Sequence, residues 1–174
     1  MQNLATPLTT LGLRPRDALT WEGSVDGVMV ELQLMPRPTP PQHYELAFTL
    51  TPANPYPSLF AVPKTHWFAA PDTPLSTAAF DTFDHRFDQA IVLRGEPSLI
   101  ALFDHERRHE LLSLMTEHTL VIDAGRVLLF PQPDHPRLAD TLNRALALAR
   151  HLGTTDLTEG VVRYLADPSP YVRD

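Results

Sequence analysis

The chain has 174 residues, 43% of them apolar and 20% charged, and a formal net charge of −7. This length and composition are typical of one globular domain, and the acidic balance argues against general nucleic-acid binding, which needs a basic surface. The absence of cysteine excludes disulfides, thiol nucleophiles and cysteine metal ligands. With no apolar run suited to a secretory signal or a membrane helix, we expect a soluble cytoplasmic protein.

The first half of the chain predicts short β-strands separated by proline-rich turns. Asp26-Gly27 is a strong two-residue turn signal, and the alternating apolar residues after it predict a hairpin with one buried face. The stretch HYELAFTL repeats this alternation, and SLFAVP and THWFA predict further short strands. The proline clusters MPRPTPPQ, TPANPYPS and APDTPLS end regular structure because proline lacks a backbone donor.

The second half predicts a buried strand, a hairpin and the helices. The continuous apolar run at 90–93, closed by Arg94-Gly95, is typical of a strand covered on both faces. The hairpin over 119–130 turns near Asp123-Ala124-Gly125, and its apolar arms predict a place in the sheet centre. Four helices are expected, of which the first covers 97–103 and the last 156–166. The second covers 105–116 and is capped by Asp104. The third begins after a cap at Asp134, has Pro136 in its first turn and ends at Gly153.

This order of elements predicts an α+β fold, a mainly antiparallel sheet with helices packed on one face. We expect a single domain over 1–174. It would comprise a proline-rich β part over about 1–94, a helix-hairpin-helix part over about 95–166 and a tail over 167–174.

The stretch FDHERRHELL contains the H-E-x-x-H spacing of many zinc peptidases. On a helix, His105 and His109 would reach one Zn²⁺, and Glu106 would polarise the zinc-bound water. One hypothesis is therefore a zinc-dependent hydrolase with Glu106 as its catalytic residue and the two histidines as its metal ligands.

Several features favour an exposed polar helix start over this zinc site. With eight histidines and eight glutamates, the motif arises by chance in roughly 2% of such chains. Met115 stands where a third histidine would follow, and the Asp104 cap places both histidines at the positive end of the helix dipole. Because Arg108 falls within the apolar arc, we expect the first turn to project past the core into solvent. The other candidate third ligands are Asp123, Asp134, Asp140, His118 and His135.

A second acidic pattern occupies the segment AFDTFDHRFD, where Phe-Asp pairs recur at helical spacing. Three carboxylates on one helix face could hold Mg²⁺ or Ca²⁺, but no glycine or calcium-loop spacing accompanies them. We therefore predict an amphipathic turn with three core phenylalanines and a solvated acidic edge. The phenylalanines are Phe80, Phe83 and Phe87, and the aspartates are Asp81, Asp84 and Asp88.

A family resemblance covers roughly residues 85–150. Phe87-Asp88, an apolar strand, Arg94-Gly95-Glu96, a helix with Leu111-Leu112 and a following hairpin resemble a family of uncharacterised bacterial domains. The resemblance implies an α+β module and assigns no catalytic or metal-binding residue.

We therefore expect a non-catalytic binding or structural module that engages a protein partner and needs no cofactor. Its acidic surface would favour a basic patch on that partner. The zinc-dependent hydrolase is the alternative, and a small-ligand-binding domain with a pocket between the proline-rich loops and the sheet is the second. Neither nucleic acid nor a membrane is expected as a partner.

Overall fold

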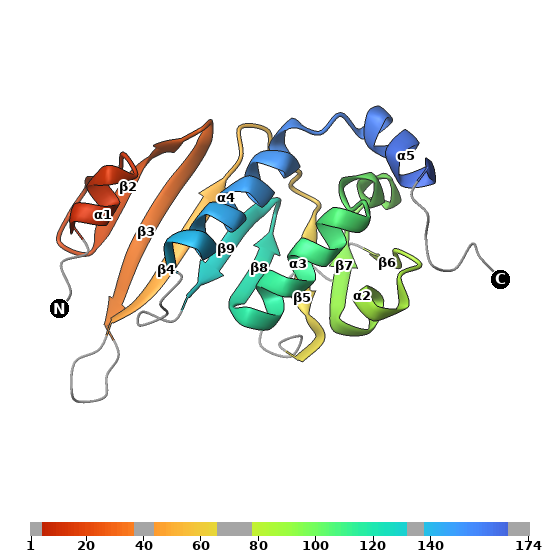
Figure 1. Cartoon of the computed structure of the whole chain (residues 1–174), viewed down its shortest axis with the longest axis horizontal. Helices are drawn as coiled ribbons and strands as arrows, with labels where there is room; N and C mark the ends of the chain where they lie inside the picture. The colour runs from red at the N-terminus through yellow and green to blue at the C-terminus, as the bar shows by residue number, and fades with distance from the viewer. Residues whose placement is uncertain (1–4, 37–43, 66–77, 132–137, 167–174) are drawn as a thin grey trace.

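One antiparallel sheet organises the fold, in the strand order β1-β2-β3-β4-β9-β8-β5-β7-β6 (Figure 1). The computed structural model describes residues 5–36, 44–65, 78–131 and 138–166. The hairpin of β8 and β9 lies at the middle of this sheet, as predicted. The strands are β1 (Arg14–Pro15), β2 (Thr20–Val25), β3 (Val28–Pro36), β4 (Tyr44–Thr51), β5 (Phe60–Pro63), β6 (Ala79–Phe80), β7 (Ile91–Arg94), β8 (Thr119–Asp123) and β9 (Arg126–Phe130).

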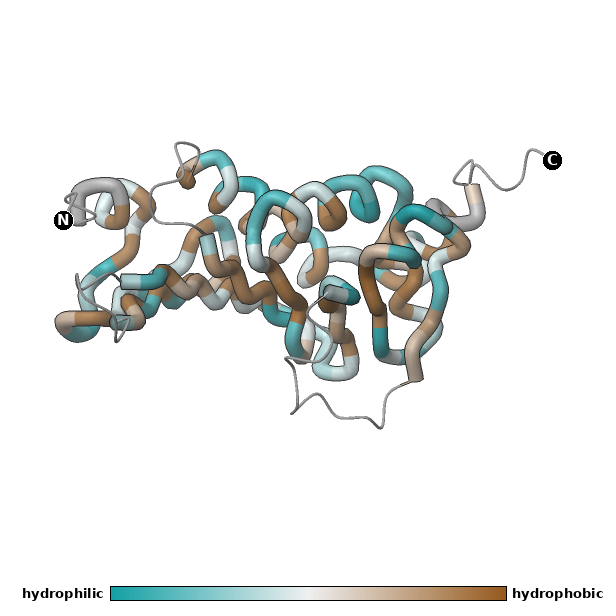
Figure 2. The backbone as a smooth tube through the Cα atoms, turned by 90° about the horizontal axis from the view of Figure 1, so that it is seen from below, coloured by the Kyte–Doolittle hydropathy of each residue, from teal (hydrophilic) through white to brown (hydrophobic). Residues whose placement is uncertain are grey.

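Helices α3 and α4 lie on the same face of the sheet (Figure 2). Helix α4 packs on β3, β4 and β9, α3 packs on β8, and α5 packs against the 3₁₀ helix η2. The predicted α+β class is thereby confirmed. The helices are α1 (Ala5–Thr10), α2 (His85–Ala90), η2 (Pro97–Leu102), α3 (His105–Glu117), α4 (Leu138–Thr154) and α5 (Leu157–Ala166).

The strand register places the apolar side chains on the helix-covered face. Each strand exposes alternate residues on opposite faces, so paired positions share a face. A row of paired residues crosses the sheet and is buried throughout, which removes its apolar surface from water and stabilises the fold. The row runs through Val30, Leu50, Val127, Ile122, Ala61 and Leu93.

Two predicted helix boundaries are settled by the structure. The Asp104 side chain accepts a hydrogen bond from the Arg107 backbone N–H at 2.9 Å, which confirms the predicted cap of α3. Gly153, in contrast, does not stop α4, which continues to Thr154. A Cβ at Gly153 would lie 2.5 Å from the Pro52 Cβ, so glycine is needed there for close packing on the segment after β4. The predicted cap Asp134 and Pro136 lie outside the described residues.

Other predictions also fall outside the described part of the chain. The strand expected at THWFA lies there beyond Thr65, as does the whole C-terminal stretch DPSPYVRD. Across the ranges that the structure describes, every helix is too short or too polar to cross a lipid bilayer.

Candidate functional site

A small cavity opens between α2 and the first turns of α3. Its volume is about 190 Å³. That is below the about 300–1,000 Å³ typical of cofactor and drug-sized sites, so it suits a single small group. Residues of the H-E-x-x-H stretch and of the acidic stretch AFDTFDHRFD both line this cavity. Its lining residues are Asp84, Arg86, Phe87, His105, Arg108, His109 and Leu112.

The acidic stretch does not form the predicted amphipathic turn with three core phenylalanines. Phe87 is buried and its ring centroid lies 6.4 Å from that of Phe103, so it anchors α2 to the core. Phe80 lies in β6 and is half-buried. Phe83 is 72% exposed, so the prediction of a core residue was wrong there. The reason is that helix α2 begins only at His85, which leaves Phe83 in the preceding loop.

Two aspartates of this stretch fix the loop instead of forming a cation site. Asp88 Oδ1 accepts hydrogen bonds from the Thr82 backbone N–H at 3.0 Å and from the Thr82 hydroxyl at 2.8 Å. Asp84 caps α2, because its Oδ1 accepts from the Phe87 backbone N–H at 3.1 Å. Both side chains therefore satisfy groups of their own loop and helix, while Asp81 is exposed.

Arg108 connects the loop to α3 from a buried position. Its Nε donates to Asp84 Oδ2 at 3.2 Å, and its Nη1 donates to the Phe103 carbonyl at 2.7 Å. The side chains of Arg108 and Asp84 are 2% and 18% exposed. The expectation that the first turn of α3 projects past the core was therefore wrong at this residue. Burial is tolerated because the carboxylate and the carbonyl accept its donors.

The two histidines of the motif lie on one side of α3, as their spacing of four residues requires. His105, His109 and Glu106 are all exposed, and both histidines line the cavity. The cavity lining contains one carboxylate, that of Asp84, which already accepts from Arg108 and Phe87. Among the described residues, no group of three histidines, aspartates or glutamates has the geometry of a metal site.

The candidate third ligands are dispersed. His118 caps the far end of α3 and bonds to the Thr141 hydroxyl through Nε2 at 2.9 Å. Asp123 pairs with Arg126 in the β8–β9 hairpin. Asp140 is exposed on α4. Asp134 and His135 lie outside the described residues. Zinc binding by His105 and His109 thus remains a prediction, without a third protein ligand in the described part of the chain.

Sequence reasoning missed the contributions of Arg86 and Phe83 to this corner of the molecule. The Asp84 cap has a sequence signal, because an aspartate directly precedes the helical stretch HRFDQA. The exposure of Phe83 has none, since a Phe-Asp repeat at helical spacing is typical of a buried helix face. Only the late start of α2 turns this phenylalanine outward.

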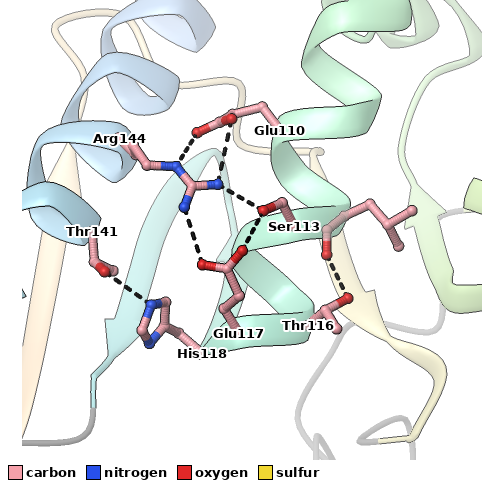
Figure 3. A network of polar contacts seen from close by, with 8 residues as sticks. Glu110, Ser113, Thr116, Glu117, His118, Thr141 and Arg144 are labelled. Atoms are coloured by element: carbon pink, nitrogen blue, oxygen red, sulfur yellow. Dashed lines mark hydrogen bonds and ion pairs between the residues drawn. The ribbon is translucent and has the colours of Figure 1, made fainter. Parts of the chain in front are cut away.

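A separate polar network ties α3 to α4 (Figure 3). Arg144 Nε donates to Glu110 Oε1 at 2.8 Å, and its Nη1 donates to Glu117 Oε2 at 3.1 Å. The Ser113 hydroxyl donates to Glu117 Oε1 at 2.7 Å and accepts from Arg144 Nη2 at 2.8 Å. The hydrogen bond from Ser113 lowers the pKa of the Glu117 carboxyl below its ordinary value, and Arg144 lowers it further. The network fixes the helix that carries the cavity histidines.

This network predicts an acid-sensitive contribution to stability. Because the pKa of Glu117 is lower in the folded state, its contribution is present above the ordinary value of 4.5 and is lost as the pH falls through the folded-state pKa. Glu117→Gln should lower the free energy of unfolding by no more than about 1 kcal/mol at pH 7, because the site is largely exposed. The difference from wild type should be much smaller at a pH well below 4.5, where the carboxyl becomes protonated in the folded state as well.

Urea unfolding of wild type and variant at both pH values measures this difference. Glu96→Gln is the control, because Glu96 is exposed and makes no side-chain cap bond. A difference between wild type and Glu117→Gln that is the same at both pH values would contradict the assignment.

Comparison of the chain with protein-family models, with curated proteins and with solved structures finds no match.

Proposed function

We propose that this protein is a non-catalytic binding module that engages a protein partner at the α2–α3 corner, with Phe83 as the central contact. The observation that carries the proposal is the combination of exposure and backbone conformation at this residue. Phe83 is 72% exposed and has a φ of +60°. It directly precedes Asp84, which lines the cavity.

The left-handed backbone at Phe83 has an energetic cost. For a residue with a Cβ this conformation costs about 1–2 kcal/mol, and glycine or asparagine would adopt it more easily. A bulky aromatic residue in such a conformation is an outlier of the kind that clusters at functional sites. With its side chain in solvent, Phe83 also obtains little burial energy within its own chain to offset that cost.

The surrounding bonds hold this residue in one arrangement. Thr82 is bonded to Asp88 on one side, and Asp84 is bonded to Phe87 and Arg108 on the other. A preorganised loop loses little conformational entropy on binding, which favours affinity. Exposed aromatic side chains on such supports are typical of the few residues that dominate the energy of protein interfaces.

Phe83→Asn should stabilise the isolated protein and weaken its binding to the partner. Asparagine tolerates the left-handed region, so we expect the free energy of unfolding to rise by about 1 kcal/mol and the Tm by about 2–4 °C. Loss of the aromatic side chain should weaken partner binding at least about tenfold. Thermal unfolding measures the first effect, and calorimetric titration with the purified partner measures the second.

The partner is identified by cross-linking in cells that express the protein with a photo-reactive phenylalanine analogue at position 83. Position 162 on α5 is the control, since Val162 is a 65% exposed apolar residue far along the chain. Support requires one protein that cross-links from 83 and not from 162, and that binds the purified chain more weakly after Phe83→Asn than after Val162→Ala. If no protein cross-links preferentially from 83, or if both variants bind alike, the proposal fails.

A further inference from the structure

We propose that the cavity beside Phe83 binds a carboxylate side chain of the partner, so that the bound segment is an acidic peptide with a neighbouring apolar residue. This inference rests on the proposed function, because it names the chemistry of the partner at the same site. It runs against the overall charge of the chain, which is −7 and would by itself favour a basic partner.

The charge of the cavity lining carries the inference. Two arginines, Arg86 and Arg108, line it against one carboxylate, Asp84. That carboxylate is already used, since Oδ1 accepts from the Phe87 backbone and Oδ2 accepts from Arg108. The buried Arg108–Asp84 pair is close to neutral as a unit, so Arg86 supplies the net positive charge of the lining.

The donors around the cavity suit an oxygen acceptor. Arg86 is exposed on α2 and presents a guanidinium, which binds carboxylates through two parallel N–H donors. His109 is exposed on α3, and an imidazole has at least one N–H donor in either tautomer. The two side chains come from different helices and line the same cavity, so one carboxylate can accept from both.

The size and the apolar part of the lining limit the occupant. About 190 Å³ accommodates one acidic side chain and is small for a nucleotide. Phe87 and Leu112 form the apolar part of the lining. Phe83 directly precedes the cavity-lining Asp84 in the chain, and its exposed aromatic surface is available to an apolar neighbour of the carboxylate. Specificity would come from the pairing of charge, and most of the affinity from the aromatic contact.

Selection of short random peptides displayed on phage, with the whole immobilised chain as the target, tests the inference. Counter-selection against the immobilised Phe83→Asn variant removes peptides that bind to other surfaces of the protein. We expect the enriched peptides to share an aspartate or glutamate beside an apolar residue. In the wild-type protein, replacing that acid with its amide should weaken binding about tenfold, equivalent to about 1.4 kcal/mol.

The amide change should weaken binding less in Arg86→Gln and in His109→Gln than in wild type, because each variant lacks one of the two donors to the acid. Arg150→Gln is the matched control, since Arg150 is an exposed arginine on α4 that pairs with Asp26 instead. It should respond to the amide change as wild type does. All variants are first compared by melting temperature, and Arg86→Gln and Arg150→Gln should match wild type because both side chains are exposed.

The outcomes separate the two proposals. One contrary result is that the enriched peptides need Phe83 and yet share no acidic residue, and another is that the amide change weakens binding equally in wild type and in Arg86→Gln. Either result would overturn the carboxylate inference without contradicting the proposed binding module. If no peptide is enriched for wild type over Phe83→Asn, both proposals fail. If the amide change weakens binding less in Arg86→Gln than in wild type, and equally in Arg150→Gln and wild type, the result supports both proposals.

Discussion

Arg108→Met should lower the free energy of unfolding by about 3 kcal/mol or more, the expected cost of breaking a buried ion pair by removing one partner. Arg108 is 2% exposed, and it donates to both Asp84 and the Phe103 carbonyl. Methionine fills much of the same volume, so the loss reports the stranded carboxylate and carbonyl and not a cavity. Urea unfolding at neutral pH measures it. A drop of this size corresponds to a Tm lower by about 6–12 °C in a chain of this length.

A double variant identifies the source of that loss. In Asp84→Ser with Arg108→Met, serine retains the cap of α2 while both charges are removed. Replacing both partners of a buried pair is often close to neutral, so the double variant should be more stable than Arg108→Met alone. Arg107→Ala, at the half-buried neighbour on α3, should cost much less. If the double variant is as unstable as the single one, the carboxylate is not the cause.

Gly125→Ala should be comparably destabilising, by at least about 3 kcal/mol. Gly125 has a φ of +74° in the turn between β8 and β9. A Cβ there would lie 2.5 Å from the Tyr56 backbone nitrogen and 2.7 Å from its carbonyl oxygen. Because the obstacle is backbone, it cannot move aside as a flexible side chain would. The Gly125 N–H also donates to the Leu59 carbonyl at 3.0 Å, so a shift of the turn would break the contact that leads into β5.

Gly27→Ala is the matched control for this prediction. Gly27 occupies the same place in the β2–β3 turn, with a φ of +80°, but a Cβ there would meet nothing within 4 Å. Only the left-handed conformation is then penalised, by about 1 kcal/mol. Thermal or urea unfolding of the two variants separates conformational strain from collision. Equal losses at both glycines would show that the approach of Tyr56 is unimportant.

The two turns show where sequence reasoning succeeds. Both hairpins have their first turn residue at positive φ, Asp26 at +50° and Ala124 at +51°, followed by glycine. This local pattern is readable because a two-residue turn between twisted strands demands it. What the sequence does not contain is the difference between the two glycines. That difference arises from Tyr56, which is distant in the chain.

The candidate site shows the same division more strongly. The i, i+4 spacing of His105 and His109 on a capped helix follows from the sequence, because helical geometry and capping depend on neighbouring residues. The environment of these two histidines does not follow from the sequence. Arg108 was expected near solvent, yet it is buried and pairs with Asp84, which lies 24 residues earlier in the chain.

Sequence by itself determined the elements of this protein: the alternating strands, the two glycine turns, the Asp104 cap and the α+β class. These depend on the period of apolar residues and on groups within a few positions of one another. Tertiary structure alone decided that α2 starts late, that Phe83 faces solvent, that Asp84 neutralises Arg108, and that Gly153 is a packing glycine. Each of these depends on contacts between segments that only the folded chain brings together, and the proposed binding site is built from such contacts.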